Sequence, residues 1–220
     1  MAARWASFDC YGTLIDWDGG VAAQLERLFG AKSVPRLLAR YHEVEPALQA
    51  AEPGRSYRDV LTLSLEALAD EEGVSLDGEA DALARSLPTW PAFPEARGAL
   101  AELRTRGWSI AVLSNTDPDF LDASLSLVGA PVDLRVVASE IGSYKPARGH
   151  WDAFFAATEA VPALHVHVGA SLFHDVVPCS ALGIPCVWID RLDEGPDPRA
   201  TRILPDLTAL PGTLDELVPS

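Results

Sequence analysis

The chain has 220 residues, of which 48% are hydrophobic, and its formal net charge is -15 at neutral pH. This length can hold one α/β core with a smaller insert, and the composition predicts an ordered globule. The acidic balance argues against nucleic acids and anionic membranes as partners. It also means that a small anionic substrate needs cations placed close to its site.

The sequence contains no sign of export or membrane insertion. No apolar stretch is long enough to span a bilayer, and Met1–Trp5 lead into the first predicted strand without a signal-peptide core. An odd number of cysteines without metal-binding spacing suits free thiols in a reducing compartment; they are Cys10, Cys179 and Cys186. We therefore expect a cytoplasmic protein and leave its assembly into a homodimer open.

The first predicted strand, Trp5–Phe8, ends at an aspartate. Asp9 follows the apolar run directly, and Gly12 breaks the strand after it. An aspartate at the carboxyl end of a strand lies where α/β sheets build their sites. Such a carboxylate can attack carbon or phosphorus and form a covalent ester. It can equally serve as a helix N-cap, so this position alone leaves both interpretations open.

The segment from Trp17 to Leu87 reads as all helix, because apolar residues recur at helical spacing. Ser56 with Asp59 resembles a capping box that opens a helix ending near Gly73. Pro46 is expected to kink or end the second helix. We predict a helical cap domain over residues 17–90, bounded by a Pro-rich linker, with residues 1–16 and 91–220 forming the core.

Four further apolar runs predict strands in the second half of the chain, at 108–113, 134–137, 164–168 and 185–189. Helical patterns separate them, and this alternation implies a parallel sheet with right-handed crossovers. The predicted fold class is therefore α/β, with a Rossmann-like parallel-sheet core and an inserted all-helical cap. Active groups are expected at the strand carboxyl ends, near Asp9, Ser114 and the segment after Gly169.

Four segments form an ordered pattern: Asp9–Thr13, Leu113–Thr116, Tyr144–Pro146 and Gly169–Asp175. Together they resemble the haloacid dehalogenase superfamily, and in detail its 2-haloacid dehalogenases of type II. The resemblance covers nearly the whole chain. It implies a hydrolase in which Asp9 displaces halide from a small 2-haloacid and forms an aspartyl ester, which water then hydrolyses.

The resemblance also assigns roles to other core residues. Thr13, Lys145 and Asp175 would orient Asp9 and the ester. Ser114 and backbone N–H groups would hold the substrate carboxylate. The implied partner is therefore a small anionic organic molecule.

The remaining substrate contacts implied by the resemblance come from both domains. Arg40 matches by position the cap arginine that meets the leaving halide, with Asn115 as its partner. Arg40 could instead be a surface helix charge, and Asn115 a local turn residue. Trp151 stands where close relatives carry tyrosine, and Tyr11 is expected beside the substrate. Cap residues proposed to line the pocket are Trp17, Tyr41 and Leu48.

Two positions distinguish carbon–halogen cleavage from phosphate-ester cleavage. Tyr11 stands where the superfamily's phosphatases carry a second aspartate that protonates the departing alkoxide, whereas a halide needs no proton. Ala170 stands where they carry an acidic metal ligand, so Asp9 and Asp175 alone make a poor Mg²⁺ site. Lys145 is expected to balance these carboxylates and keep Asp9 ionised. No cofactor is expected for a dehalogenase, and Mg²⁺ only for a phosphatase.

The last motif departs from the dehalogenase pattern. Ala170 and Leu172 replace small polar residues that position the hydrolytic water. Ser171 and His174 are polar neighbours that could substitute, with His174 as a base for water. These changes would also suit another carboxylate substrate, such as a strained ring opened at carbon. A Mg²⁺-dependent small-molecule phosphatase and a catalytically impaired family member stay open as alternatives.

Overall fold

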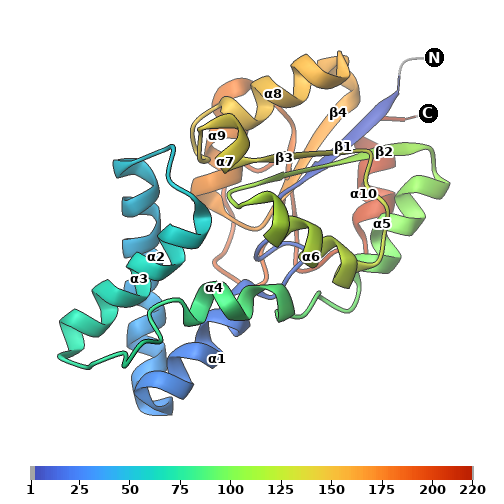
Figure 1. The fold of residues 1–220 in the computed structure, drawn as a ribbon. Helices are drawn as coiled ribbons and strands as arrows, with labels where there is room; N and C mark the ends of the chain where they lie inside the picture. Colours follow the sequence, from blue (N-terminus) through green and yellow to red (C-terminus); the bar gives the residue numbers. More distant parts are fainter. Residues whose placement is uncertain (1–2, 220) are drawn as a thin grey trace.

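The computed structural model describes residues 3–219, so the first two residues of the expected leaderless start lie outside it. Its parallel strands form a sheet in the order β3-β2-β1-β4-β5-β6 (Figure 1). The strands are β1 Arg4–Phe8, β2 Trp108–Ser114, β3 Leu134–Val137, β4 His165–Gly169, β5 Cys186–Ile189 and β6 Arg202–Leu204. β1 lies between β2 and β4, with Phe8 in register with Val112 and Val168. The predicted α/β class and its first five strands are confirmed.

Sequence patterns did not predict β6, which lies at the sheet edge beyond β5. The strand has three residues, two of them exposed, so it offers no hydrophobic run to recognise.

Helices cover both faces of the sheet (Figure 1). One face carries α8 (Gly149–Thr158) and α9 (Val177–Leu182), and the other carries α5 (Ala96–Thr105), α6 (Pro118–Val128) and α10 (Leu210–Leu217). Alternate residues of β2 point to opposite faces, so Leu113 packs with Trp151 and Val112 belongs to the other cluster. Burial on both faces explains why the strands read as continuous apolar runs.

Several shorter elements complete the core. They are α7 (Ala138–Ile141), 3₁₀ turns at Leu87–Thr89 and Pro162–Leu164, and a π-helical turn, η4, at Leu172–Val176. Among the described residues, no helix combines the length and the hydropathy needed to cross a bilayer.

Beside the carboxyl ends of the strands, α1 (Trp17–Phe29), α2 (Val34–Ala51), α3 (Tyr57–Glu72) and α4 (Ala82–Ser86) pack on one another, with a 3₁₀ turn at Ala31–Ser33 (Figure 1). We refer to residues 17–86 as the helical cap. Ser56 Oγ accepts a hydrogen bond from the Asp59 N–H, and Gly73 ends α3 in the left-handed region, as predicted. That residues 17–90 form a separate domain remains a proposal.

Of the two expected effects of Pro46, ending the second cap helix is not observed, since α2 continues to Ala51. Proline removes one backbone hydrogen bond and costs about 3 kcal/mol in a helix interior. The buried side of α2 is continuous across this point, since Tyr41, Glu45 and Gln49 are all buried. Packing of that side against the rest of the molecule therefore outweighs the local penalty.

Asp117, in the loop after β2, fastens the cap to the core. Its two carboxylate oxygens each accept a hydrogen bond at 2.9 Å from the first N–H groups of α3, those of Tyr57 and Arg58. These groups have no partner within the helix, and the helix dipole favours a negative charge there. Asp117 is itself buried, so the contact is shielded from water.

Replacing Asp117 with alanine is expected to lower the free energy of unfolding by at least about 2 kcal/mol, because two helix N–H groups lose a charged acceptor. Asp119→Ala is the matched control: that carboxylate is exposed and pairs with Arg58 at the surface, so its loss should cost at most about 1 kcal/mol. Urea titrations followed by circular dichroism compare the two variants. Equal effects would show that Asp117 does not fasten the cap.

Candidate active site

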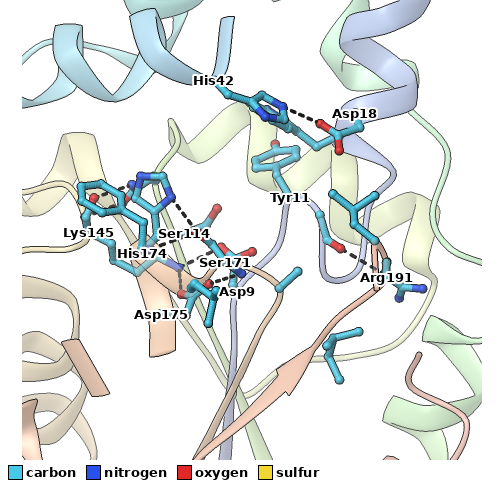
Figure 2. A pocket seen from close by; sticks show the side chains of 18 of the residues that line it. Asp9, Tyr11, Asp18, His42, Ser114, Lys145, Ser171, His174, Asp175 and Arg191 are labelled. Carbon is cyan, nitrogen blue, oxygen red and sulfur yellow. Dashed lines mark hydrogen bonds and ion pairs between the residues drawn. The ribbon is translucent and has the colours of Figure 1, made fainter. Parts of the chain in front are cut away.

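The carboxyl ends of β1, β2 and β4 and the helical cap enclose one cavity of about 630 Å³ (Figure 2). This volume is within the range of small-molecule pockets. The residues predicted from the sequence that line it are Asp9, Tyr11, Trp17, Ser114, Asn115, Lys145, Ser171, His174 and Asp175. The expected gathering of motifs at the strand ends is therefore observed.

Lys145 lies between two carboxylates at the bottom of the cavity. Its Nζ donates hydrogen bonds to Asp9 Oδ1 at 2.8 Å and to Asp175 Oδ1 at 2.7 Å. The lysine side chain is 1% exposed. Burial alone lowers the pKa of Lys145, but the Asp175 and Asp9 carboxylates outweigh this effect and raise that pKa above its usual value. The amine therefore stays charged at neutral pH.

The two carboxylates differ in basicity. Burial alone raises the pKa of Asp175, but the Lys145 ammonium and His167 outweigh it and hold this pKa well below its usual range. Burial raises the pKa of Asp9 above its usual value, although Lys145 opposes the shift. Asp175 is the permanent counter-charge, and Asp9 is the more basic oxygen nucleophile of the pair.

Thr13 orients the second oxygen of Asp9. Its hydroxyl donates to Asp9 Oδ2 at 2.9 Å and accepts a hydrogen bond of the same length from the Ala170 N–H. One side chain thus links the turn after β1 to the loop after β4. With Lys145 on Oδ1 and Thr13 on Oδ2, the carboxylate of Asp9 is held at both oxygens.

Asp175 is held by a buried chain of polar groups that the sequence analysis missed. His167 Nε2 lies 3.1 Å from Asp175 Oδ1, and His167 Nδ1 lies 2.8 Å from Ser7 Oγ. Since the carboxylate accepts, His167 donates through Nε2 and its Nδ1 accepts the Ser7 hydroxyl. The Ser7 oxygen in turn lies 2.7 Å from His165 Nε2. Histidines two apart in one predicted strand were the available signal, because they share a face of the sheet.

Gly169 permits the close approach of Asp175 to the end of β4. A Cβ atom at position 169 would lie 2.4 Å from Asp175 Cγ, too close for any other residue. The glycine that ends the strand is therefore required by the site.

Asn115 holds the loop that carries Lys145. Its Oδ1 accepts from the Lys145 N–H at 2.7 Å, and its Nδ2 donates to the Lys145 carbonyl at 3.0 Å and to Gln49 Oε1 at 3.2 Å. Both amide hydrogens are thus engaged. The structure gives Asn115 a positioning role, and its expected contact with a leaving halide stays a prediction.

Two predicted substrate residues, Arg40 and Trp151, do not line the cavity. Arg40 lies at the surface and pairs with Glu71 and Glu43 at 2.8 and 2.7 Å. On a helix, positions 40 and 42 point roughly 200° apart, so an α2 that turns His42 toward the cavity turns Arg40 away.

Trp151 is 1% exposed and packs edge-on against His167, with ring centroids 5.4 Å apart. Its indole therefore supports the Asp175 chain from within the core and does not replace a tyrosine hydroxyl at the substrate. Tyr41 and Leu48 are also absent from the lining of this cavity. The residues that α2 contributes to the lining are their neighbours on that helix, His42, Glu45 and Pro46.

The cap contributes polar residues that the sequence analysis did not select. His42 and Asp18 lie on the side of the cavity opposite Asp9 (Figure 2), with His42 Nε2 2.8 Å from Asp18 Oδ1. This hydrogen bond raises the pKa of His42. Glu45, one helical turn further along α2, also lines the cavity and is 5% exposed. None of these three residues belongs to a motif, so only the packing of α1 and α2 reveals them.

Ser114 and Tyr11 both line the cavity, but their hydroxyl groups differ in hydrogen bonding. Ser114 Oγ is buried and has no hydrogen-bond partner within residues 3–219. The Tyr11 hydroxyl is engaged with Ser124 Oγ at 3.0 Å, and burial raises the pKa of Tyr11 far above its usual value. Ser114 is therefore free to bind a substrate oxygen, whereas Tyr11 is a poor proton donor.

His174 is neutral at physiological pH, because burial lowers its pKa to about 4. Its Nδ1 lies 3.2 Å from Ser171 Oγ, while its Nε2 has no partner among the residues that the structure describes. When Nδ1 donates to Ser171, Nε2 carries the lone pair of the ring, and this atom is itself buried. Water activation by His174 stays a prediction.

The residues around Asp9 do not fit a magnesium ion. Mg²⁺ demands near-octahedral oxygen ligands, whereas position 170 carries a methyl group and Asp9 and Asp175 both bind the Lys145 ammonium. Over the described range 3–219, no three His, Cys, Asp or Glu side chains gather as a metal site would need. The carboxylate oxygens of Asp9 and Asp175 are arranged to bind the Lys145 ammonium.

Known proteins resemble this chain in sequence and in fold. A family model described as haloacid dehalogenase-like hydrolase matches residues 4–183. The (S)-2-haloacid dehalogenase 1 of Pseudomonas sp. (strain CBS-3) is 27% identical over 197 residues, which cover 87% of this chain and 86% of that protein. The structure of an L-2-haloacid dehalogenase from Xanthobacter autotrophicus superposes with a TM-score of 0.81 over 96% of this chain and 98% of that one. Its sequence identity is 19%, so this likeness concerns the fold.

A phosphatase also matches part of the chain. The phosphoserine phosphatase of Thermus thermophilus is 33% identical over 132 residues, which cover 58% of this chain. The matched region spans 51% of that enzyme's length.

Replacing Lys145 with methionine is expected to lower the free energy of unfolding by about 3–5 kcal/mol at pH 7.5, because two buried carboxylates lose their cation. In the native protein, the depressed pKa of Asp175 gives stability that is lost only as the pH falls below the ordinary aspartate pKa of about 4, and it is therefore retained between pH 7.5 and 5. In the variant the carboxylates repel and one binds a proton, so the deficit should shrink toward pH 5.

Urea titrations at both pH values measure this effect. Lys32→Met, at the chain's other lysine, is the matched control, since Lys32 is exposed and should change stability by less than about 0.5 kcal/mol. A Lys145→Met deficit that is small, or that grows toward pH 5, would contradict the ammonium's role.

Proposed function

Since the chain belongs to the haloacid dehalogenase-like hydrolase family, we propose that it cleaves the carbon–halogen bond of 2-haloacids without a metal, through an ester on Asp9. The observation that carries the proposal is the Lys145 ammonium bound to both Asp9 and Asp175. A hydrolase that works at carbon needs an ionised nucleophile and a leaving group that departs as a stable anion. The amine supplies the first condition, and a halide meets the second.

In the first step, an Asp9 oxygen attacks the α-carbon and the bonding electrons leave with the halide. Lys145 and Thr13 hold the carboxylate in one orientation during the attack. The unpartnered hydroxyl of Ser114 is placed to bind the substrate carboxylate. Asp175 takes no part in bond making and keeps the ammonium in place.

In the second step, water attacks the carbonyl carbon of the Asp9 ester. His174 accepts the water proton at Nε2, since its neutral imidazole is available above about pH 4. The bond from the carbonyl carbon to the substrate oxygen breaks, the hydroxy acid takes up a proton, and Asp9 returns to the carboxylate form. His174 and Ser171 thus replace the side chains that Ala170 and Leu172 cannot provide.

A magnesium-dependent phosphatase is the second candidate, favoured by the 33% identity to a phosphoserine phosphatase. Two residues count against it. Tyr11, whose pKa is raised by burial, is a poor proton donor to a departing alkoxide. Ala170 contributes no ligand, so the donor set does not fit Mg²⁺.

A single turnover in H₂¹⁸O tests the proposal. With enzyme in excess over 2-chloropropionate and EDTA present, we expect chloride release and lactate whose new oxygen is unlabelled, because it comes from Asp9. The label should appear in the Asp9 peptide by mass spectrometry. Asp9→Asn should reduce chloride release by at least about 10³-fold.

Labelled lactate in the first turnover, or full activity of Asp9→Asn, would overturn the nucleophile assignment. An aryl phosphate hydrolysed only with Mg²⁺ would favour the phosphatase, and silence toward both substrates would indicate an impaired family member. His174→Asn separates the two steps: chloride should still be released once per site, while the ester accumulates as a mass adduct on Asp9. Absence of that adduct would remove His174 from the hydrolytic step.

A further inference from the structure

Arg191 is a cation that the proposed reaction does not use. It lies in the loop that follows β5, beside the turn that carries Asp9 (Figure 2), and its side chain is 17% exposed. A guanidinium in this place could bind an anionic substrate, since it is among the residues that line the cavity. Its Nε and Nη2 atoms, however, both donate hydrogen bonds to the protein itself. We therefore ask what these bonds hold in place.

The first group of contacts fixes the nucleophile turn, which we define as residues 9–16 between β1 and α1. Arg191 Nε donates to the Gly12 carbonyl at 3.2 Å, and Nη2 donates to the Thr13 carbonyl at 2.9 Å. Within residues 3–219, no backbone N–H donates to either of these oxygens. Thr13 is fully buried, and a buried carbonyl without a donor is costly. The guanidinium therefore stabilises this turn.

Thr13 connects the turn to the reacting carboxylate. Its hydroxyl donates to Asp9 Oδ2 at 2.9 Å, while its carbonyl is the one that Arg191 binds. A displacement of the turn would therefore move the hydrogen-bond donor away from one oxygen of the nucleophile. Through Thr13, Arg191 acts on the orientation of Asp9.

The second group of contacts reaches the return segment, which we define as residues 90–95 between the helical cap and α5. Glu95 Oε1 accepts from Arg191 Nη2 at 2.7 Å. Arg191 Cζ also lies 3.5 Å from the centre of the Phe93 ring, in the geometry of a cation–π contact. One side chain thus binds both the nucleophile turn and the return segment.

Backbone hydrogen bonds join the same two segments. The Phe93 N–H donates to the Leu14 carbonyl at 2.9 Å, and the Asp16 N–H donates to the Pro91 carbonyl at 2.8 Å. The chain enters the cap through the nucleophile turn and leaves it through the return segment. A displacement of the cap relative to the core therefore acts on both segments at this junction.

We propose that Arg191 is a positioning residue that couples the return segment of the cap to the orientation of Asp9. The inference deepens the proposed function, on which it rests for the reaction that Asp9 performs. An arginine suits this place because its planar fork binds two carbonyls and a carboxylate while its face lies on an aromatic ring. A lysine carries the same charge but has neither the fork nor the face. The coupling therefore depends on the shape of the guanidinium.

The kinetic test uses single turnovers of 2-chloropropionate in EDTA. At saturating substrate, we expect Arg191→Lys and Arg191→Gln each to slow chloride release by about 10–100-fold, because the attacking oxygen is less well oriented. The substrate concentration that gives half the maximal rate should change by less than about 3-fold. A substrate-binding role predicts the reverse: weaker half-saturation in Arg191→Gln that Arg191→Lys restores. That result would overturn the inference.

Amide hydrogen exchange tests the coupling without any reaction. The nucleophile turn offers protected reporters, since the N–H groups of Leu14 and Ile15 donate to the Cys10 carbonyl at 2.7 and 3.0 Å. Glu95→Ala removes the carboxylate that Arg191 binds on the return segment. We expect faster exchange in peptides that cover the nucleophile turn, because Arg191 is held less firmly. In an Arg191→Gln background, Glu95→Ala should cause no further increase.

Arg199→Gln is the matched control in the same loop. Arg199 is 46% exposed and pairs with Asp197, so its loss should change neither chloride release nor exchange. Thermal melts monitor folding, and Arg191→Lys with Glu95→Ala replaces Arg191→Gln if that variant does not fold.

Two results would overturn the inference and leave the proposed function standing: exchange in the nucleophile turn that Glu95→Ala does not change, or chloride release that neither Arg191 variant slows. If the wild type releases no chloride, the proposed function fails. The exchange data then decide the coupling, since faster exchange in Glu95→Ala supports it and unchanged exchange rejects it.

Discussion

Two buried carboxylates, Asp9 directly after β1 and Asp175 in the η4 turn that follows β4, are bridged and balanced by the Lys145 ammonium. Two buried carboxylates that share one site cannot both stay ionised without a cation. The surrounding structure serves that balance. Asn115 clasps the backbone of the Lys145 loop, and Gly169 makes room for the Asp175 carboxylate.

The proposed amine-centred site constrains the chemistry. A divalent ion would polarise a phosphoryl group and stabilise its extra charge. An ammonium bound to both carboxylates adds no such ligand site, but it opposes the rise that burial causes in the pKa of Asp9 and orients one oxygen of that carboxylate. The site is thereby suited to attack at carbon, where the leaving group carries the charge away. The partial match to a phosphoserine phosphatase is explained by the shared family.

The cap adds a second set of determinants, from residues that no motif identifies. α2 turns His42 and Glu45 toward the cavity and directs Arg40 to surface partners on its own helix and α3. The wall facing the nucleophile therefore holds a protonatable imidazole and a protonatable carboxyl group in place of a fixed guanidinium charge.

The sequence was informative where chemistry depends on strand ends and uninformative where it depends on helix rotation. Asp9 and the segment that holds Asp175 could be placed because a parallel sheet gathers the carboxyl ends of its strands, whereas Lys145 was placed through the family resemblance. Arg40 was misplaced because the direction of a helical side chain depends on how the helix packs, and two positions reverse it. Trp151 was likewise assigned by position alone, whereas its ring packs on His167 inside the core. His167 itself was hidden in an apolar strand pattern.

Manganese binding, followed by electron paramagnetic resonance of free Mn²⁺ at neutral pH, tests the amine-centred site most directly. Mn²⁺ is a hard cation that accepts the oxygen ligands of magnesium sites. If Lys145 occupies the place of the metal, the wild type and Asp175→Asn will show the same weak binding to the acidic surface. A tightly bound, stoichiometric Mn²⁺ in the wild type that disappears in Asp175→Asn would contradict the account.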